Sequence, residues 1–308
     1  MVFPGQGSQS VGMQADLVAA NTVVADCYTE ASDILGYDLW QIVAEGPAER
    51  LNVTTTTQLA MLTAGYATWR AWQALGGATP ELMAGHSLGE YTALVCAGSV
   101  SFADALKVVR KRSELMQSAV PAGAGAMAAI LGLEDEAIIE VCAAAAGKGV
   151  ADAVNFNAPG QVVIAGDVAA IDRAIELAKE RGARRALLLP VSVPAHSALM
   201  RGAGEALVDA LASAQFSNPA ITVIAASDAR PYTDGADIRA RLSRQVYAPV
   251  RWVDTINAMT GAGATRIIEC GPGKVLAGLI RRIDKSLACD TIDSVDSLQY
   301  ALQCEETA

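Results

Sequence analysis

Between residues 81 and 90 the chain reads Glu81-Leu82-Met83-Ala84-Gly85-His86-Ser87-Leu88-Gly89-Glu90. A short apolar run predicts a strand over Glu81–Ala84, and a helical pattern follows from Glu90 to Ala97. Between them, Gly85 to Gly89 fits G-x-S-x-G, whose glycines allow a sharp turn from strand to helix. Such a turn lifts a serine hydroxyl out of the end of a sheet. The segment therefore predicts an α/β protein with Ser87 as its nucleophile.

Two kinds of pattern divide the rest of the chain. Before residue 123 and after residue 190, strand and helix patterns alternate, which is typical of a mostly parallel sheet covered by helices. Residues 123–190 show the order β-α-β-β-α-β, the split βαβ pattern of a ferredoxin-like unit. We therefore expect a body formed by residues 1–122 and 191–308, with an insertion at residues 123–190.

Capping residues and glycines mark the ends of several expected elements. The clearest helices run from Asn21 or Thr22 to Gly36, from Gln58 to Leu75, and from Ser101 to Ser118. After residue 190 the patterns predict helices at Ala198–Ala212 and Ile238–Val246, strands at Ile221–Ile224 and Arg266–Cys270, and a final helix from Gly273.

Composition excludes several classes of function. Hydrophobic residues make up 52% of the 308 residues and charged residues 18%, which indicates a globular protein. There is no signal-like leader and no apolar run long enough to span a bilayer, so we expect a cytoplasmic protein. A net charge of −10 argues against a nucleic-acid partner. Six scattered cysteines and only two histidines argue against a metal site.

A serine nucleophile needs a base, and the chain holds only two histidines. His86 adjoins the nucleophile on the turn, where its side chain should point into the fold. His196 lies downstream in a loop that leads to a helix, and serine before histidine is the chain order of α/β-hydrolases. His196 is therefore the expected general base.

Three clusters of basic residues could serve an acidic partner in spite of the net charge. They are Arg110-Lys111-Arg112, Arg181 with Arg184-Arg185, and Arg281-Arg282. Each cluster is equally compatible with a solvated helix face.

Five motifs occur in an order that resembles one family. They are Phe3-Pro4-Gly5-Gln6-Gly7-Ser8-Gln9, Gly85-His86-Ser87-Leu88-Gly89-Glu90-Tyr91, Gly125-Ala126-Met127, Val191-Ser192-Val193-Pro194-Ala195-His196 and Gly271-Pro272-Gly273-Lys274. Together they are similar to the malonyl-CoA:acyl-carrier-protein transacylases of bacterial fatty-acid synthesis, nearly end to end. The resemblance implies an α/β-hydrolase-like body with a ferredoxin-like insertion, which agrees with the pattern of elements.

The resemblance also implies catalytic roles. Ser87 matches the family nucleophile and His196 its general base. Gln6 matches the loop residue whose backbone N–H joins that of Leu88 in an oxyanion hole. Gln245 matches the residue whose backbone carbonyl orients the histidine in place of a carboxylate, so its side chain is given no role.

Substrate contacts follow from the same resemblance. Arg112 matches the arginine that pairs with the malonyl carboxylate. Gln58 and Asn157 match positions that line the substrate site or support it. The implied partners are malonyl-CoA and a phosphopantetheinylated acyl carrier protein, with the enzyme a monomer. No metal or other cofactor is implied, because coenzyme A enters only as part of the substrate.

Two other functions share parts of this pattern. A serine acyl hydrolase or thioesterase would keep the turn, the histidine and the oxyanion hole, but it has no reason to hold an arginine at the acyl pocket. A non-catalytic module that only docks a carrier protein would need none of Ser87, His196 and Arg112.

Overall fold

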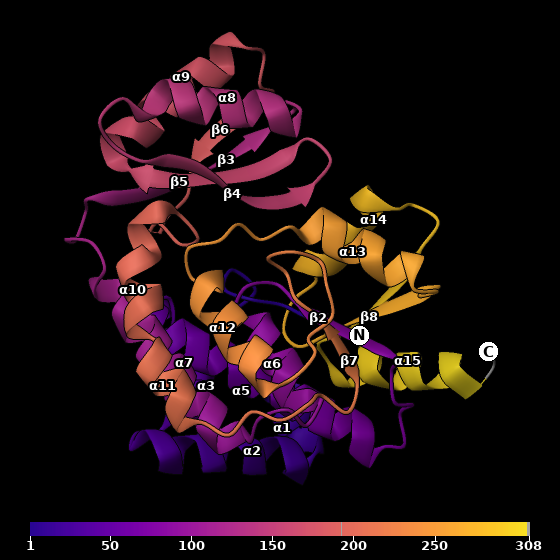
Figure 1. Ribbon diagram of the computed structural model, residues 1–308. Helices are drawn as coiled ribbons and strands as arrows, with labels where there is room; N and C mark the ends of the chain where they lie inside the picture. Colours follow the sequence, from indigo (N-terminus) through magenta and orange to yellow (C-terminus); the bar gives the residue numbers. More distant parts are fainter. Residues whose placement is uncertain (192, 307–308) are drawn as a thin grey trace.

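The computed structural model describes residues 1–191 and 193–306, so Ser192 of the fourth motif lies outside the described residues. The described chain forms two sheets, one in each of the expected units (Figure 1). No helix in this part of the chain has the length and apolarity needed to cross a membrane.

A five-stranded sheet forms the centre of the body. Its order is β7-β2-β1-β8-β9, and every neighbouring pair is parallel. The strands are β1 (Val2–Phe3), β2 (Leu82–Gly85), β7 (Thr222–Ile224), β8 (Arg266–Cys270) and β9 (Ala288–Ile292). Phe3 lies opposite Gly85, and Val2 lies opposite Glu269. The glycine-rich loops that follow β1, β2 and β8 therefore meet at the carboxyl ends of these parallel strands.

Helices cover both faces of this sheet (Figure 1). Those before the insertion are α1 (Ala15–Ala20), α2 (Thr22–Leu35), α3 (Leu39–Glu45), α4 (Ala48–Leu51), α5 (Thr54–Ala74), α6 (Gly89–Cys96) and α7 (Phe102–Ser118). Those after it are α10 (Arg201–Ala206), α11 (Val208–Ser213), α12 (Gly235–Gln245), α13 (Trp252–Gly261), α14 (Val275–Ile283) and α15 (Val295–Glu306), with a 3₁₀ turn at Ala198–Met200. The buried side chains of α5, α6 and α7 form much of the largest hydrophobic core.

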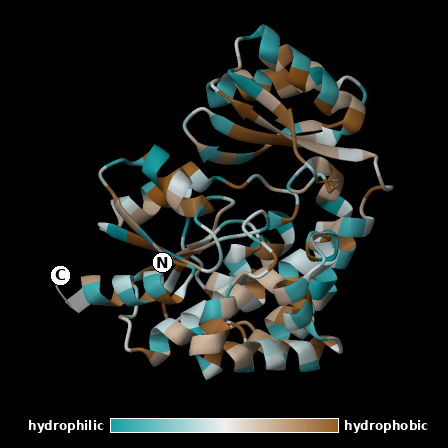
Figure 2. Cartoon of the chain, turned by 180° about the vertical axis from the view of Figure 1, so that it is seen from behind, coloured by the Kyte–Doolittle hydropathy of each residue, from teal (hydrophilic) through white to brown (hydrophobic). Residues whose placement is uncertain are grey.

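The insertion is a four-stranded antiparallel sheet with the order β4-β5-β3-β6. Its elements are β3 (Gly125–Leu131), α8 (Asp135–Ala146), β4 (Ala151–Ala158), β5 (Gln161–Asp167), α9 (Val168–Glu180) and β6 (Arg185–Leu188). The two helices pack on one face, and Figure 2 shows hydrophobic residues along the strands beneath them. The ferredoxin-like prediction is confirmed, while the boundaries at residues 123 and 190 stay predictions.

One edge strand of the insertion is hydrogen-bonded to the body. The Phe156 N–H donates to the Val250 carbonyl at 2.9 Å, and the Val250 N–H donates to the Val154 carbonyl at 2.8 Å. This pairing places the face of the insertion sheet that carries Met127 and Val163 over the strand ends where the body's loops meet.

Most capped elements lie where the sequence predicts them. The helix from Thr22 ends at Gly36, and the Ser101 hydroxyl accepts the Asp104 N–H. The helix expected over residues 198–212 is instead a 3₁₀ turn followed by α10 and α11, which are separated at Leu207. The helix expected from Gly273 begins at Val275, and it is not the final one, because β9 and α15 follow it. The sequence patterns do not indicate these two elements or α13.

Candidate active site

The turn at Ser87 is held by backbone packing that only glycine permits. Ser87 has a φ of 51°, the left-handed conformation of a strained nucleophile turn. A Cβ on Gly85 would lie 1.9 Å from the Gly89 carbonyl carbon, and one on Gly89 would lie 2.0 Å from the Phe3 oxygen. Strand β1, strand β2 and the start of α6 therefore approach too closely for any side chain at these two positions.

His196 lies within hydrogen-bond distance of Ser87. Its Nε2 lies 2.7 Å from Ser87 Oγ, and its Nδ1 lies 2.8 Å from the Gln245 carbonyl and 3.1 Å from the Ala248 carbonyl. Carbonyl oxygens only accept, so Nδ1 carries the proton and Nε2 is free to accept the serine proton. The backbone N–H of His196 is itself bonded to the Val246 carbonyl, which fixes the ring.

The His196 imidazole is neutral at physiological pH. Burial is the main cause that lowers the pKa of His196, to about 3, and the Arg112 charge adds to the shift. No carboxylate contacts the ring among residues 1–191 and 193–306, since backbone carbonyls occupy that place. The pair can therefore deprotonate Ser87 without first losing a proton from His196.

Two backbone N–H groups beside Ser87 are available to an oxyanion. A Cβ on Gly5 would lie 2.5 Å from the His86 oxygen and 3.7 Å from the Leu88 nitrogen, so the first loop passes directly against the turn. Within the described chain, the N–H groups of Gln6 and Leu88 donate to no acceptor. Leu88 also precedes α6, whose N-terminal dipole favours negative charge.

Arg112 is a buried cation that faces only neutral oxygens. Its side chain is 1% exposed on α7. Nη1 donates to Gln58 Oε1 at 2.6 Å, while Nη2 donates to Gln245 Oε1 at 2.9 Å and to Ser87 Oγ at 3.2 Å. No described carboxylate lies within ion-pair distance of it. Burying a charge without a counter-ion is costly, so the guanidinium marks a place for an anionic group beside the nucleophile.

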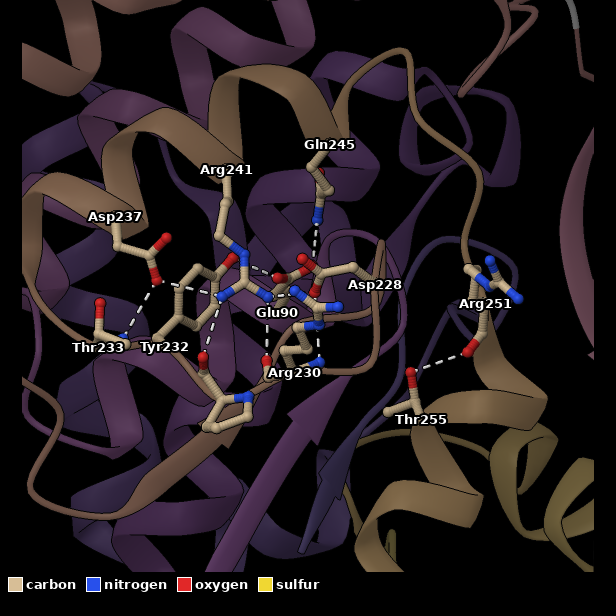
Figure 3. A network of polar contacts seen from close by, with 11 residues as sticks. Glu90, Asp228, Arg230, Tyr232, Thr233, Asp237, Arg241, Gln245, Arg251 and Thr255 are labelled. Atoms are coloured by element: carbon tan, nitrogen blue, oxygen red, sulfur yellow. Dashed lines mark hydrogen bonds and ion pairs between the residues drawn. The ribbon is translucent and has the colours of Figure 1, made fainter.

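The side chain of Gln245 has contacts that the sequence analysis missed. Its Nε2 donates to the Ser87 carbonyl at 2.7 Å and to Glu90 Oε2 at 2.8 Å, and its Oε1 accepts from Arg112. The predicted backbone contact to His196 is present as well. A signal existed in the spacing of Asp237, Arg241 and Gln245, which places three polar side chains on one face of α12 (Figure 3).

His86 points into the fold, as its place on the turn predicts. Its Nε2 lies 2.8 Å from Asn157 Oδ1, and its ring centre lies 5.5 Å from that of Trp252. Asn157, which is 9% exposed on β4, therefore supports the turn from the insertion, and it is Asn155 on the same strand that lines the cavity.

A cavity of about 470 Å³ leads to Ser87 between the insertion and the body. The first loop, the turn and Gln58 form one side, and Met127, Val163 and Leu189 form an apolar side. The polar groups that converge on Ser87 are thus at the base of a space large enough for an acyl group with part of its carrier. This arrangement has the groups that acyl transfer through a serine ester requires.

Known proteins share both the sequence and the fold. The model of the acyl transferase domain matches residues 1–299. The malonyl CoA-acyl carrier protein transacylase of Haemophilus influenzae is 53% identical over 96% of each chain, and that of Bacillus subtilis is 42% identical over 98% of this chain and 95% of the relative.

Solved structures agree. The acyl carrier protein S-malonyltransferase of Vibrio cholerae superposes with a TM-score of 0.95, at 54% identity over 97% of this chain and 98% of the other. A malonyl-transacylase in complex with its type II polyketide acyl-carrier protein gives 0.97, at 49% identity over 99% and 98%. The chain therefore belongs to the acyl transferase family, among the malonyl CoA-acyl carrier protein transacylases.

Proposed function

We propose that the protein moves malonyl groups from coenzyme A to the phosphopantetheine thiol of an acyl carrier protein, through an ester on Ser87. The observation that carries this proposal is Arg112, a buried guanidinium with neutral partners only, within hydrogen-bond distance of the nucleophile. Malonyl groups end in a carboxylate, and a guanidinium can meet both of its oxygens.

In the first half-reaction, His196 takes the Ser87 proton as the hydroxyl oxygen attacks the thioester carbon. The oxyanion forms beside the N–H groups of Gln6 and Leu88. When it collapses, the carbon–sulfur bond breaks and coenzyme A leaves as a thiol with the proton from His196. The carboxylate on Arg112 also offsets one of the causes that lower the pKa of His196, so the malonyl group makes its own base stronger.

The second half-reaction runs through the same groups in reverse. The carrier thiol gives its proton to His196 and attacks the ester carbonyl, and Ser87 leaves with that proton. The chemistry requires no metal, nucleotide or flavin, and coenzyme A enters only as part of the substrate. A serine hydrolase would share every group except Arg112. An acyl group without a carboxylate would leave this buried guanidinium without a counter-ion.

The proposal predicts a malonyl ester on Ser87 when no acceptor thiol is supplied. Brief exposure to malonyl-CoA should add one malonyl group, because no thiol is present to take it from the ester. Intact mass followed by a peptic digest measures the adduct and its position. An adduct on a cysteine, or rapid release of free malonate, would contradict the proposal.

The lowered pKa of His196 predicts an unusual pH profile. The base is already neutral at every pH above about 3, so kcat/KM should be flat from about pH 5 to pH 8. Malonyl-pantetheine is the suitable donor because it lacks the phosphates of coenzyme A. An activity that falls below about pH 6.5, where an ordinary histidine titrates, would show that the ring is not held in this state.

Carrier docking is proposed at a basic strip formed by Arg184, Arg185 and Arg282. Leu131 lies opposite both Arg185 and Gln161, so β6 and β5 bring these residues to one end of the insertion sheet. Arg282, on α14 of the body, donates to Gln161 Oε1 at the same end. Two of the clusters seen in the sequence therefore meet, while Arg181 pairs with Glu140 at 2.8 Å.

Salt should separate the two kinds of acceptor. Transfer to the carrier protein is expected to weaken steeply as salt rises, because acidic carriers approach through long-range attraction to the strip. Free pantetheine carries no charge and should show almost no dependence. An Arg185→Glu variant should lower carrier transfer and leave pantetheine transfer unchanged, and equal salt slopes for both acceptors would remove the strip from the proposal.

A monomeric state and a cytoplasmic location stay predictions.

A further inference from the structure

Glu90 is a buried carboxylate directly behind the nucleophile turn. It is the second residue of α6 and is 0% exposed. Its Oε1 accepts from the Tyr232 hydroxyl, and its Oε2 accepts from Gln245 Nε2 at 2.8 Å. Burial raises the pKa of Glu90, and the hydrogen bonds from these two side chains oppose that shift. The Gln245 amide nitrogen can only donate, and the hydrogen bonds from Gln245 and Tyr232 together with the nearby Arg241 charge favour the carboxylate form.

The Gln245 amide connects this carboxylate to Arg112. A carboxylate can only accept and a guanidinium can only donate, so the amide has one possible orientation between them. Its nitrogen faces Glu90 and the Ser87 carbonyl, and its oxygen faces Arg112 at 2.9 Å. Along these hydrogen bonds, the Glu90 carboxylate is therefore separated from the buried Arg112 guanidinium by one side chain, that of Gln245.

Arg241 anchors the other end of the chain (Figure 3). It is 5% exposed on α12 and pairs with Asp228 and with Asp237 Oδ2, the latter at 3.1 Å. It also donates to the Pro231 carbonyl at 3.0 Å, and its guanidinium lies 4.5 Å from the centre of the Tyr232 ring. The loop that carries Tyr232 is thus fixed, and Tyr232 fixes Glu90.

We propose that Glu90 is the counter-charge of Arg112, acting through Gln245, and that it limits how tightly the site holds a malonyl carboxylate. In the empty site Glu90 lowers the cost of burying the cation. With malonyl bound, two carboxylates share one guanidinium, so Glu90 opposes the second. Both half-reactions use the same site, so a moderate affinity for the malonyl carboxylate allows the malonyl group to leave after it has been transferred to the carrier. The inference rests on the proposed function, and Glu90 is a positioning residue within it.

Two substitutions separate charge from hydrogen bonding. Glu90→Gln removes the charge but keeps the shape, because its amide oxygen can accept from Gln245 and its nitrogen can donate to the Tyr232 oxygen. Tyr232→Phe keeps the charge and removes one hydrogen bond to the same carboxylate, so it is the matched control.

Binding is measured by calorimetry in a Ser87→Ala background, in which no ester can form. Glu90→Gln should tighten malonyl-CoA binding about fivefold, since it removes a like charge near the bound carboxylate. Acetyl-CoA has no carboxylate and should change by less than about twofold. Tyr232→Phe should leave the ratio of the two affinities unchanged. With Ser87 restored, Glu90→Gln should lower both KM and kcat for malonyl transfer.

Malonyl-CoA binding that is unchanged or weaker in Glu90→Gln would overturn the inference, as would equal shifts for malonyl-CoA and acetyl-CoA. If Ser87→Ala alone does not distinguish the two ligands, the role of Arg112 fails first, and the inference falls with it. Should Glu90→Gln not fold, Glu90→Asp draws the charge back by one methylene. Glu90→Asp should then tighten malonyl-CoA binding by less than Glu90→Gln, and weaker malonyl-CoA binding would contradict the role of Glu90 as a counter-charge.

Discussion

Replacing Arg112 with alanine is expected to lower kcat/KM for malonyl-CoA by roughly 30-fold or more. A malonyl carboxylate would then enter a buried pocket without a partner, and removing one member of such a pair costs about 2–5 kcal/mol. Acetyl-CoA should lose far less, because the wild-type site leaves Arg112 unpaired when acetyl is bound. The measurement is the ratio of kcat/KM for malonyl-CoA to that for acetyl-CoA.

The neighbouring residues supply the controls. Arg112→Lys should recover only part of the loss, because an ammonium cannot bond Gln58, Gln245 and a carboxylate with the geometry of a guanidinium. Lys111 is exposed on another face of α7, so Lys111→Ala should behave as wild type. An unchanged ratio in Arg112→Ala would mean that the substrate carboxylate binds elsewhere.

Replacing His196 with alanine is expected to lower acyl transfer by about 10²–10⁴-fold for malonyl and acetyl donors alike, since the general base is lost. The ring fills a small space beside the cavity, and circular dichroism should show that the fold persists. Transfer close to the wild-type rate would show that another group takes the Ser87 proton.

Gln245→Ala should fall between wild type and His196→Ala. Alanine keeps the backbone carbonyl that holds His196, but it loses the contacts to Ser87, Glu90 and Arg112. The resemblance assigns a role only to the backbone carbonyl of Gln245, which predicts a nearly harmless substitution. The structure predicts instead a lower malonyl-to-acetyl ratio, which His196→Ala should not show. An unchanged malonyl-to-acetyl ratio would mean that only the backbone carbonyl of Gln245 has a role.

The nucleophile turn could be predicted because its requirements are local. Gly85 and Gly89 are needed by backbone atoms of the turn and of β1, and the pattern is written in five consecutive residues. His196 could be found because only one other histidine exists, and that one adjoins Ser87. The split βαβ order of the insertion was equally local, as each strand and helix there is short, apolar on one face and bounded by turn residues.

The polar chain behind the turn could not be predicted in the same way. Glu90 and Tyr232 are 142 residues apart, and Glu90 and Gln245 are 155 apart, so only the tertiary fold brings the start of α6 together with the Tyr232 loop and the end of α12. The strand β9 was missed for a related reason. It is a half-exposed edge strand without a continuous apolar run, and its pairing with β8 defines it.

The positive φ angles of Ser87 and His196 have a consequence for how the protein tolerates change. Both residues hold a conformation that disfavours side chains with a Cβ, at about 1–3 kcal/mol each. That energy is supplied by the rest of the molecule, so catalysis draws on the stability margin of the fold. Substitutions far from the cavity that lower the free energy of unfolding will therefore disturb the positions of Ser87 and His196 before the chain unfolds. Activity should be a more sensitive gauge of damage to this protein than its melting temperature.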